Sequence, residues 1–404
     1  MRSSPERWVM IWLAFLATAI NYIDRQTLSV AAPVLIDQFH MSNVAYSRVL
    51  FAFLLSYTIM NAVSGPLIDR LGTRVGYALC IGWWSASSAL HAFTTGAVSL
   101  GFFRFLLGIG EAGNWPAALK IVAEWFPDRE RALASGLFNS GSAVGAILAP
   151  PLVAFIIFRM GWPSAFVMAG LLGFIWLIFW LKIYRTPPES KAETLAPPPN
   201  AWRLFKTRFV WTFTLSKIFM DPAWYFYIFW FPEYLRRARH FDMAQIGKYA
   251  WIPFFVAAAG NVLGGAVSAR LIRAGMEIPI ARKAAITLFA VWMMAAIPAV
   301  LASSPWLSIA FVSIAMAGYT GCLANMLALP TDLFAKNSVA SVYGIASMGA
   351  GFGGMLFSLV TGWVVDHFSY TPVFIGFGLM PLLCAFILWF VTGPLRAPIL
   401  VPAS

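Results

Sequence analysis

Four charged side chains lie inside otherwise apolar stretches of the first half of the chain: Asp24, Arg25, Arg104 and Glu111. The first two fall within residues 8–34 and the other two within residues 98–122. A charge at the middle of a bilayer costs at least about 2.5–3.5 kcal/mol on insertion scales, so a chain that keeps one there uses it. Two acids beside two arginines have the chemistry of a proton site next to an anion site.

Each residue type suits its part of that chemistry. The planar fork of an arginine matches a carboxylate with two parallel hydrogen bonds, and it stays protonated at any relevant pH. A carboxylic acid suits the proton site, because burial opposes its ionisation while a nearby arginine favours it. Linkage then makes proton binding and anion binding depend on each other. The alternative is that all four residues form structural ion pairs that lock helices together.

The spacing of these residues predicts how they lie. Arg104 and Glu111 are seven residues apart, which places them on one helix face, about 10.5 Å apart along the axis. A helix that enters from the outside near residue 98 puts Glu111 near mid-membrane, and counting inward from residue 8 puts Asp24 at a similar depth. We therefore expect them to approach one central cavity. Asp24 and Arg25 are about 100° apart around their helix, so they cannot point the same way.

The composition predicts an integral membrane protein. Of 404 residues, 60% are hydrophobic and only 11% are charged, which does not fit a soluble domain. A bilayer-spanning helix needs about 20 apolar residues. Twelve such windows can be placed, which predicts an all-α protein of twelve transmembrane helices: 8–34, 46–69, 74–93, 97–122, 131–158, 163–184, 207–235, 245–272, 283–302, 306–333, 338–366 and 370–393.

The net charge of +12 follows membrane topology, and we expect no nucleic-acid partner. With both termini in the cytoplasm, most arginines and lysines between the windows fall in inner loops, as the positive-inside rule requires. The outer loops hold few, mainly Arg159 and the cluster Arg236, Arg237 and Arg239. We therefore expect a multi-pass protein with both ends inside and the lipid bilayer as its surroundings.

The chain divides into two similar halves. Residues 185–206 are polar and proline-rich, and they separate an N-terminal bundle (1–184) from a C-terminal bundle (207–404), each with six windows. Matching residues recur at an offset of 208, among them Gly136, Gly141 and Gly145 with Gly344, Gly349 and Gly353. Parallel six-helix halves are typical of alternating-access transporters, which bind substrate at mid-membrane.

Features of an enzyme are missing from the sequence. It shows no catalytic His/Asp/Cys constellation, no phosphate loop and no appended domain. The four histidines fall in or near predicted outer loops without metal-ligand spacing, and the three cysteines lie far apart within predicted spans. We expect no enzymatic activity, no metal site, no disulfide framework and no cofactor, with protons as the coupling ion.

The loop after the second window resembles the signature of the major facilitator superfamily, G-x-x-x-D-R-x-G-R-R. It reads GPLIDRLGTR over residues 65–74 and departs from the signature at Thr73, where a basic residue is usual. Together with twelve windows and a half-repeat, this resemblance implies two pseudo-symmetric six-helix bundles. Asp69, Arg70 and Arg74 sit at a membrane edge, and we expect them to latch the inward gate.

Finer motifs resemble the anion:cation symporters of that superfamily, and above all the bacterial hexuronate and sugar-acid transporters. They are NYIDR (21–25), RFLLGIGEAGNWP (104–116), EWFPDRER (124–131) and KIFMDPAWYFYIFWFP (217–232). The resemblance implies that Arg25 and Arg104 hold a substrate carboxylate, that Asp24 and Glu111 couple to protons, and that Tyr57 lies at the substrate. It also implies a bacterial inner membrane.

Other polar residues in the windows complete the expected site. Lys217 and Asp221 are four residues apart and can pair on one helix face. They form either a pure ion pair, which we assign to gating through Asp221, or a cavity site in which Lys217 binds sugar hydroxyls. Further residues are expected to line the cavity, or alternatively to serve packing: Tyr22, Asn114, Asn139, Trp224, Tyr225, Asn325 and Ser347.

The sequence thus predicts a monomeric, proton-coupled symporter that imports an organic monoanion by alternating access. A hexuronate such as galacturonate or glucuronate is the expected substrate. The alternatives are another carboxylate on the same fold (an aldonate, tartrate, an aromatic acid or lactate), or an exporter.

Overall fold

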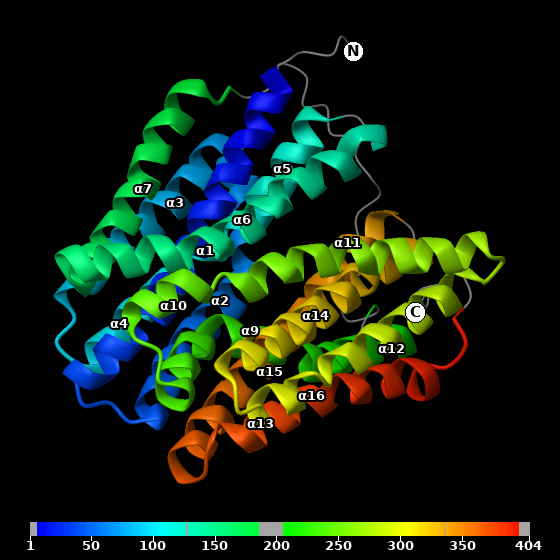
Figure 1. Cartoon of the computed structure of the whole chain (residues 1–404). Coiled ribbons are helices and arrows are strands. Elements are labelled where there is room, and N and C mark those ends of the chain that lie inside the picture. Colours follow the sequence, from blue (N-terminus) through cyan, green and yellow to red (C-terminus); the bar gives the residue numbers. More distant parts are fainter. Residues whose placement is uncertain (1–5, 127, 186–203, 205, 335, 396–404) are drawn as a thin grey trace. The chain divides into compact units, whose positions relative to one another are not determined.

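A computed structural model describes residues 6–126, 128–185, 204, 206–334 and 336–395. The described secondary structure is helical, and each predicted window coincides with one helix or with two consecutive helices (Figure 1). The elements of the first half are α1 (Glu6–Gln38), α2 (Asn43–Leu71), α3 (Thr73–Leu90), η1 (His91–Phe93), α4 (Ala97–Glu111), α5 (Asn114–Trp125), α6 (Asp128–Met160) and α7 (Trp162–Ile183). Those of the second half are α9 (Arg208–Arg239), α10 (Met243–Tyr249), α11 (Ile252–Arg273), α12 (Ile278–Met293), α13 (Ala296–Leu301), α14 (Pro305–Leu333), α15 (Lys336–His367), α16 (Tyr370–Phe386) and η2 (Ile387–Val391).

Within the described residues, eight helical segments are long and apolar enough to cross a membrane by these two criteria. The other four predicted windows fall on α1, α3, the consecutive helices α4 and α5, and α9. The window 97–122 is therefore broken, because α4 ends at Glu111 and α5 begins at Asn114. The windows 245–272 and 283–302 are interrupted in the same way, between α10 and α11 and between α12 and α13.

The chain forms two compact units. Unit 1 comprises Met1–Glu193 and Phe229–Trp251, and unit 2 comprises Thr194–Ile228 and Ile252–Ser404. The single helix α9 thus contributes its first part to unit 2 and its end to unit 1. Most of the predicted linker, residues 186–203 and 205, lies outside the described residues.

Glycines allow the helices of unit 1 to pack closely. A Cβ atom on Gly141 would lie 2.3 Å from the carbonyl oxygen of Phe15, and one on Gly145 would lie 2.3 Å from that of Ala19. No real Cβ contact is this short, so α6 can rest on α1 only because these positions have no side chain.

The same packing recurs in unit 2, at the glycines that the offset of 208 matches to Gly141 and Gly145. A Cβ on Gly349 would lie 2.7 Å from the carbonyl oxygen of Thr214, and one on Gly353 would lie 2.5 Å from that of Ile218. Helix α15 therefore rests on α9 as α6 rests on α1. The partner residues on the two first helices differ by 199 (214 − 15 and 218 − 19).

A second glycine pair extends this repeat to helices where the sequence did not reveal it. In unit 1 a Cβ on Gly110 would meet the backbone nitrogen of Trp84 at 2.7 Å. In unit 2 a Cβ on Gly318 would meet the backbone nitrogen of Met293 at 2.9 Å. Helix α4 thus packs on α3 as α14 packs on α12, again with an offset of 208 (318 − 110).

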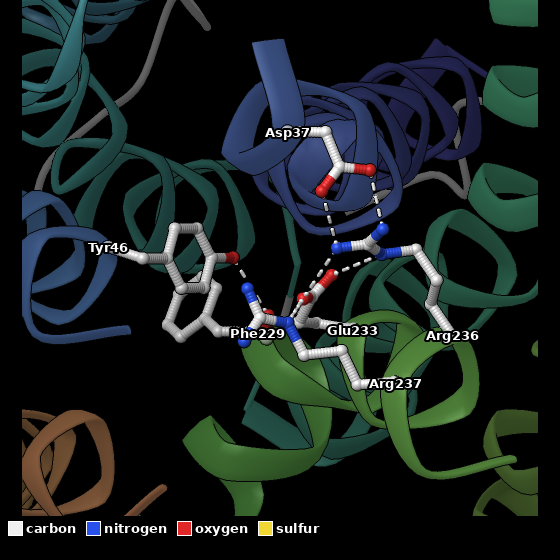
Figure 2. A network of polar contacts seen from close by, with 6 residues as sticks. All are labelled: Asp37, Tyr46, Phe229, Glu233, Arg236 and Arg237. Carbon is white, nitrogen blue, oxygen red and sulfur yellow. Dashed lines mark hydrogen bonds and ion pairs between the residues drawn. The ribbon is translucent and has the colours of Figure 1, made fainter. Parts of the chain in front are cut away.

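A polar network fastens the end of α9 to α1 and α2 inside unit 1 (Figure 2). The carbonyl oxygen of Phe229 accepts hydrogen bonds from the Tyr46 hydroxyl at 2.9 Å and from Ser29 Oγ at 3.3 Å.

The charged part of this network centres on Glu233, whose side chain is fully buried. Its carboxylate accepts hydrogen bonds from Arg237 Nε at 2.5 Å and from Arg236 Nε and Nη2 at 3.2 Å each. Arg236 also donates to the two carboxylate oxygens of Asp37, at 2.5 and 2.9 Å. The arginine cluster predicted for an outer loop is therefore largely paired with acids.

Candidate functional site

The charged residues of the first half gather inside unit 1, and two of them form an ion pair. Nε of Arg25, on α1, donates to Oε2 of Glu111, at the end of α4, over 2.6 Å. Their side chains are 5% and 0% exposed. A charge-assisted hydrogen bond between two buried side chains holds the two helices together and compensates the charge of Arg25.

Aromatic rings surround the Arg25 guanidinium. Its central carbon lies 4.4 Å from the ring centroid of Tyr57, 5.3 Å from that of Tyr22 and 5.5 Å from that of Phe53. The negative faces of such rings attract a cation, the more so where water is excluded. The predicted lining residues Tyr22 and Tyr57 therefore lie directly at the ion pair.

Arg104 differs from Arg25 in that its guanidinium has no hydrogen-bond partner among the described residues. The side chain is 1% exposed, and Nε, Nη1 and Nη2 are all buried and unbonded. Its central carbon lies 5.9 Å from the ring centroid of Phe166. Buried donors without acceptors are costly, and in this state the fork of Arg104 leaves three of them unbonded among the described residues. A carboxylate has the matching shape and charge.

Asp24 points away from its neighbour Arg25. Its Oδ1 accepts a hydrogen bond from Ser88 Oγ of α3 at 2.6 Å, and its buried Oδ2 has no partner in the described part of the chain. The charges of Arg104 and Glu111 both act on this carboxyl group. The four predicted residues thus interact electrostatically inside unit 1. The adjacent side chains of Asp24 and Arg25 turn to different helices, Asp24 to α3 and Arg25 to α4.

Three further residues of this region were not predicted as site residues. Ser88 holds Asp24. Asn21 is fully buried, and neither its amide oxygen nor its amide nitrogen has a partner among the described residues. His91, which was expected in or near an outer loop, opens η1 just before the non-helical residues 94–96, and it is fully buried. Its Nδ1 donates to the carbonyl oxygen of Ser87 at 2.7 Å, and its ring stacks on Phe166 with centroids 4.9 Å apart.

The amide of the predicted lining residue Asn114 is occupied within unit 1. Its Oδ1 accepts a bond from the Tyr77 hydroxyl at 2.7 Å, and its Nδ2 donates to Thr18 Oγ1 at 3.2 Å. Asn114 thereby joins α5 to α3 and α1. Asn139 is half-buried on α6.

Unit 2 holds its own polar centre on α9 and α14. Lys217 Nζ lies 2.7 Å from Oδ2 of Asp221, and both side chains are buried. The Tyr319 hydroxyl donates to Oδ1 of the same aspartate at 2.9 Å. Trp224 stacks on Tyr319 with centroids 5.0 Å apart and planes 10° apart. Tyr319 was not predicted from the sequence.

The remaining predicted residues of unit 2 are distributed along its helices. The amide nitrogen of Asn325 donates to the carbonyl oxygens of Gly264 at 2.9 Å and Gly321 at 3.0 Å, so it bridges α11 and α14. Tyr225 and Ser347 are half-buried. Within the described ranges, no group of three or more metal-ligating side chains is close enough to hold a metal ion.

The predicted gating residues of unit 1 lie around the junction of α2 and α3. Arg70 is exposed, and Arg74 Nη2 donates to the carbonyl oxygen of Leu181 on α7 at 2.6 Å. Thr73, the departure from the superfamily signature, donates to Glu124 at 2.7 Å. The side chain of Asp69 lies outside the described residues.

Comparisons with known proteins find membrane transporters that are similar to this chain in sequence or in fold. The family model described as Major Facilitator Superfamily matches residues 14–319 and 278–403. A hexuronate transporter of Escherichia coli (strain K12) is 32% identical over 402 residues, covering 95% of this chain and 93% of that protein. A probable galactarate/D-glucarate transporter of Bacillus subtilis (strain 168) is 28% identical, covering 99% and 94%. The solved structure of a D-xylose-proton symporter superposes with a TM-score of 0.78 at 14% identity, covering 96% of this chain and 98% of that one.

Proposed function

Since this chain belongs to the major facilitator superfamily, we propose that it is a secondary active transporter that carries an organic monoanion together with protons by alternating access. The proposed substrate is a hexuronate such as galacturonate or glucuronate. The protein is a multi-pass membrane transporter and not an enzyme. We place it in a bacterial inner membrane as a monomer with both termini in the cytoplasm.

The observation that carries the proposal is the free guanidinium of Arg104. It is buried, its three nitrogens have no partner among the described residues, and it lies in a helix of a membrane protein. A carboxylate that binds there gains two charge-assisted hydrogen bonds in a dry environment. A neutral sugar of the same shape would leave the guanidinium unbonded.

The ion pair of Arg25 and Glu111 supplies the proposed link to protons. While Glu111 is ionised, its carboxylate holds Nε of Arg25 at 2.6 Å and competes with an anion for that guanidinium. Protonation of Glu111 removes the partner charge, so Arg25 is released to join Arg104 on the substrate carboxylate. Proton and substrate then favour each other's binding, as coupled transport requires. Asp24, with one unbonded carboxyl oxygen, is the second proposed proton site.

For the other residues predicted from the sequence, we propose the roles that the sequence analysis expected. Tyr22, Tyr57, Asn114, Lys217, Asn139, Ser347, Asn325, Trp224 and Tyr225 are proposed to line the substrate path. Asp69, Arg70, Arg74 and Asp221 are proposed to act in gating.

A competition experiment tests the substrate class. Uptake of labelled galacturonate into proteoliposomes is measured against an excess of glucuronate, an aldonate, tartrate, lactate, an aromatic acid or galactose. We expect glucuronate to compete most strongly and neutral galactose to compete far more weakly, because it lacks the carboxylate that Arg104 binds. Competition by galactose equal to that of glucuronate would refute the anion site. Stronger competition by another acid would replace the hexuronate by that acid.

A further inference from the structure

Two parts of the charged centre of unit 1 meet on one buried aromatic residue, Phe166 of α7. The central carbon of the Arg104 guanidinium lies 5.9 Å from the centroid of its ring. The carbonyl oxygen of Phe166 lies 3.4 Å from Ser88 Oγ, which donates to Asp24 at 2.6 Å. Phe166 therefore contacts the unbonded guanidinium with its ring, and it contacts the residue that holds Asp24 with its backbone.

The ring of Phe166 is in turn stacked on the imidazole of His91, the first residue of η1. The two centroids are 4.9 Å apart and the planes are 12° apart. The imidazole centroid also lies 5.8 Å from that of Phe103, the residue that precedes Arg104 on α4. The fully buried imidazole thus packs against both α4, which carries Arg104, and α7, which carries the ring beside it.

The imidazole itself is fixed by the end of α3. Its Nδ1 lies 2.7 Å from the carbonyl oxygen of Ser87, one of the last four residues of α3, where backbone carbonyls lack the usual helical partners. A carbonyl oxygen only accepts, so Nδ1 carries the hydrogen of this bond. Nε2 has no partner among the described residues. One edge of His91 is therefore tied to α3, while its face supports the ring of Phe166.

We propose that His91 is a positioning residue of the anion site, whose ring acts through Phe166 to keep the Arg104 guanidinium where it receives the substrate carboxylate. The inference rests on the proposed function and adds a residue to it. Among the described residues the guanidinium has no hydrogen-bond partner, so its orientation depends on packing and on the attraction of the Phe166 ring. In a close-packed interior, removal of the imidazole lets Phe166 move, and two parallel hydrogen bonds to a carboxylate require an aligned fork.

Two substitutions separate the ring of His91 from its hydrogen bond. His91→Asn removes the ring, and its amide nitrogen takes the place of Nδ1, so it can still donate to Ser87. His91→Phe keeps a ring and removes the donor. Binding of galacturonate to the purified full-length protein is measured by calorimetry at pH 7. His91→Asn should weaken this binding at least about five-fold, and His91→Phe should change it by less than about two-fold.

A second pair of variants tests whether His91 acts through Phe166. Phe166→Leu should weaken the binding of galacturonate at least about five-fold. The double variant Phe166→Leu with His91→Asn should bind no more weakly than Phe166→Leu alone. Phe126→Leu is the matched control, because it also removes a buried ring from unit 1, one whose centroid lies 5.3 Å from that of Trp8. This control should lower the unfolding temperature and leave the affinity for galacturonate unchanged.

Several results would overturn the proposal. They are a folded His91→Asn protein with wild-type affinity, a His91→Phe protein that loses as much affinity as His91→Asn, or a double variant whose affinity falls by the product of the two single effects. A loss of affinity in Phe126→Leu as large as that in Phe166→Leu would also overturn it. If His91→Asn does not fold, wild-type affinity in His91→Phe together with weak binding by Phe166→Leu is the expected result, and any other combination overturns the proposal. A wild type that binds neither galacturonate nor any other acid would instead refute the proposed function.

Discussion

Because the Arg104 guanidinium is unbonded, we predict that one substitution there abolishes substrate binding without lowering the stability of the ligand-free protein. Arg104→Met removes the fork but keeps an extended apolar side chain in the same space. Binding of galacturonate should be lost. The ligand-free protein should not unfold at a lower temperature, because the change removes a buried cation that has no hydrogen-bond partner among the described residues.

The size of the binding effect follows from the contacts that the fork would make. A carboxylate held by two guanidinium nitrogens makes two charge-assisted hydrogen bonds, each with a net contribution of about 1.5–3 kcal/mol. Loss of both costs about 3–6 kcal/mol, which corresponds to a weakening of roughly 10²–10⁴-fold. Arg104→Lys keeps the charge and loses the fork geometry, so its affinity should fall between those of Arg104→Met and the wild type.

Thermal unfolding with and without galacturonate measures both parts at once. At a galacturonate concentration of about 100 times the wild-type dissociation constant, the wild type should gain about 2.7 kcal/mol of stability, and Arg104→Met should gain at most about 0.4 kcal/mol. A ligand-free Arg104→Met protein that unfolds well below the wild type, yet is still stabilised by galacturonate, would show that Arg104 is a structural residue. The anion-site assignment would then be wrong.

Three further substitutions test other parts of the account. Glu111→Gln resembles the protonated acid permanently. It should therefore abolish substrate accumulation driven by a pH gradient, while substrate exchange between two loaded faces of the membrane continues. Full gradient-driven accumulation by this variant would place the proton site elsewhere. Gly145→Ala would put a Cβ 2.3 Å from the Ala19 carbonyl oxygen and should lower the unfolding temperature markedly. Gly136→Ala should not, because its Cβ would have no neighbour within 4 Å among the described residues. Equal effects would contradict the packing of α6 on α1. Glu233→Ala leaves two arginines without their buried acid and should cost about 3–5 kcal/mol of stability. Asp37→Ala should cost only about 0–1 kcal/mol, because the Asp37 side chain is 62% exposed. A larger loss of unfolding free energy for Asp37→Ala than for Glu233→Ala in chemical denaturation would refute the network.

The sequence was sufficient to place the helices, because a bilayer demands long apolar windows and few other signals imitate them. It also identified Asp24, Arg25, Arg104 and Glu111 as a group, since buried charge in such windows is rare. It could not predict that Arg25 pairs with Glu111 while Arg104 has no partner. That difference depends on the rotation of α1 and α4 about their axes, which residue spacing within one helix does not determine.

Other structural features could not be predicted from the sequence for similar physical reasons. Polar residues within a span serve either packing or a site, and the residue type does not distinguish the two: Asn114 bonds to Tyr77 and Thr18, whereas both amide atoms of Asn21 lack a partner in the described structure. His91 lies at the end of an apolar window, where hydropathy does not separate the outer surface from the buried end of a bundle. The end of α9 belongs to unit 1, although nothing in a continuous helical sequence marks that boundary.

Proton movement on addition of substrate tests the central claim most directly. Purified protein is placed in liposomes in a weakly buffered medium without imposed gradients, and the external pH is recorded while labelled galacturonate is added. Proton-coupled symport predicts that the medium becomes more alkaline as galacturonate enters, and that an equal addition of galactose changes nothing. Entry of labelled galacturonate without any change in external pH would contradict the account.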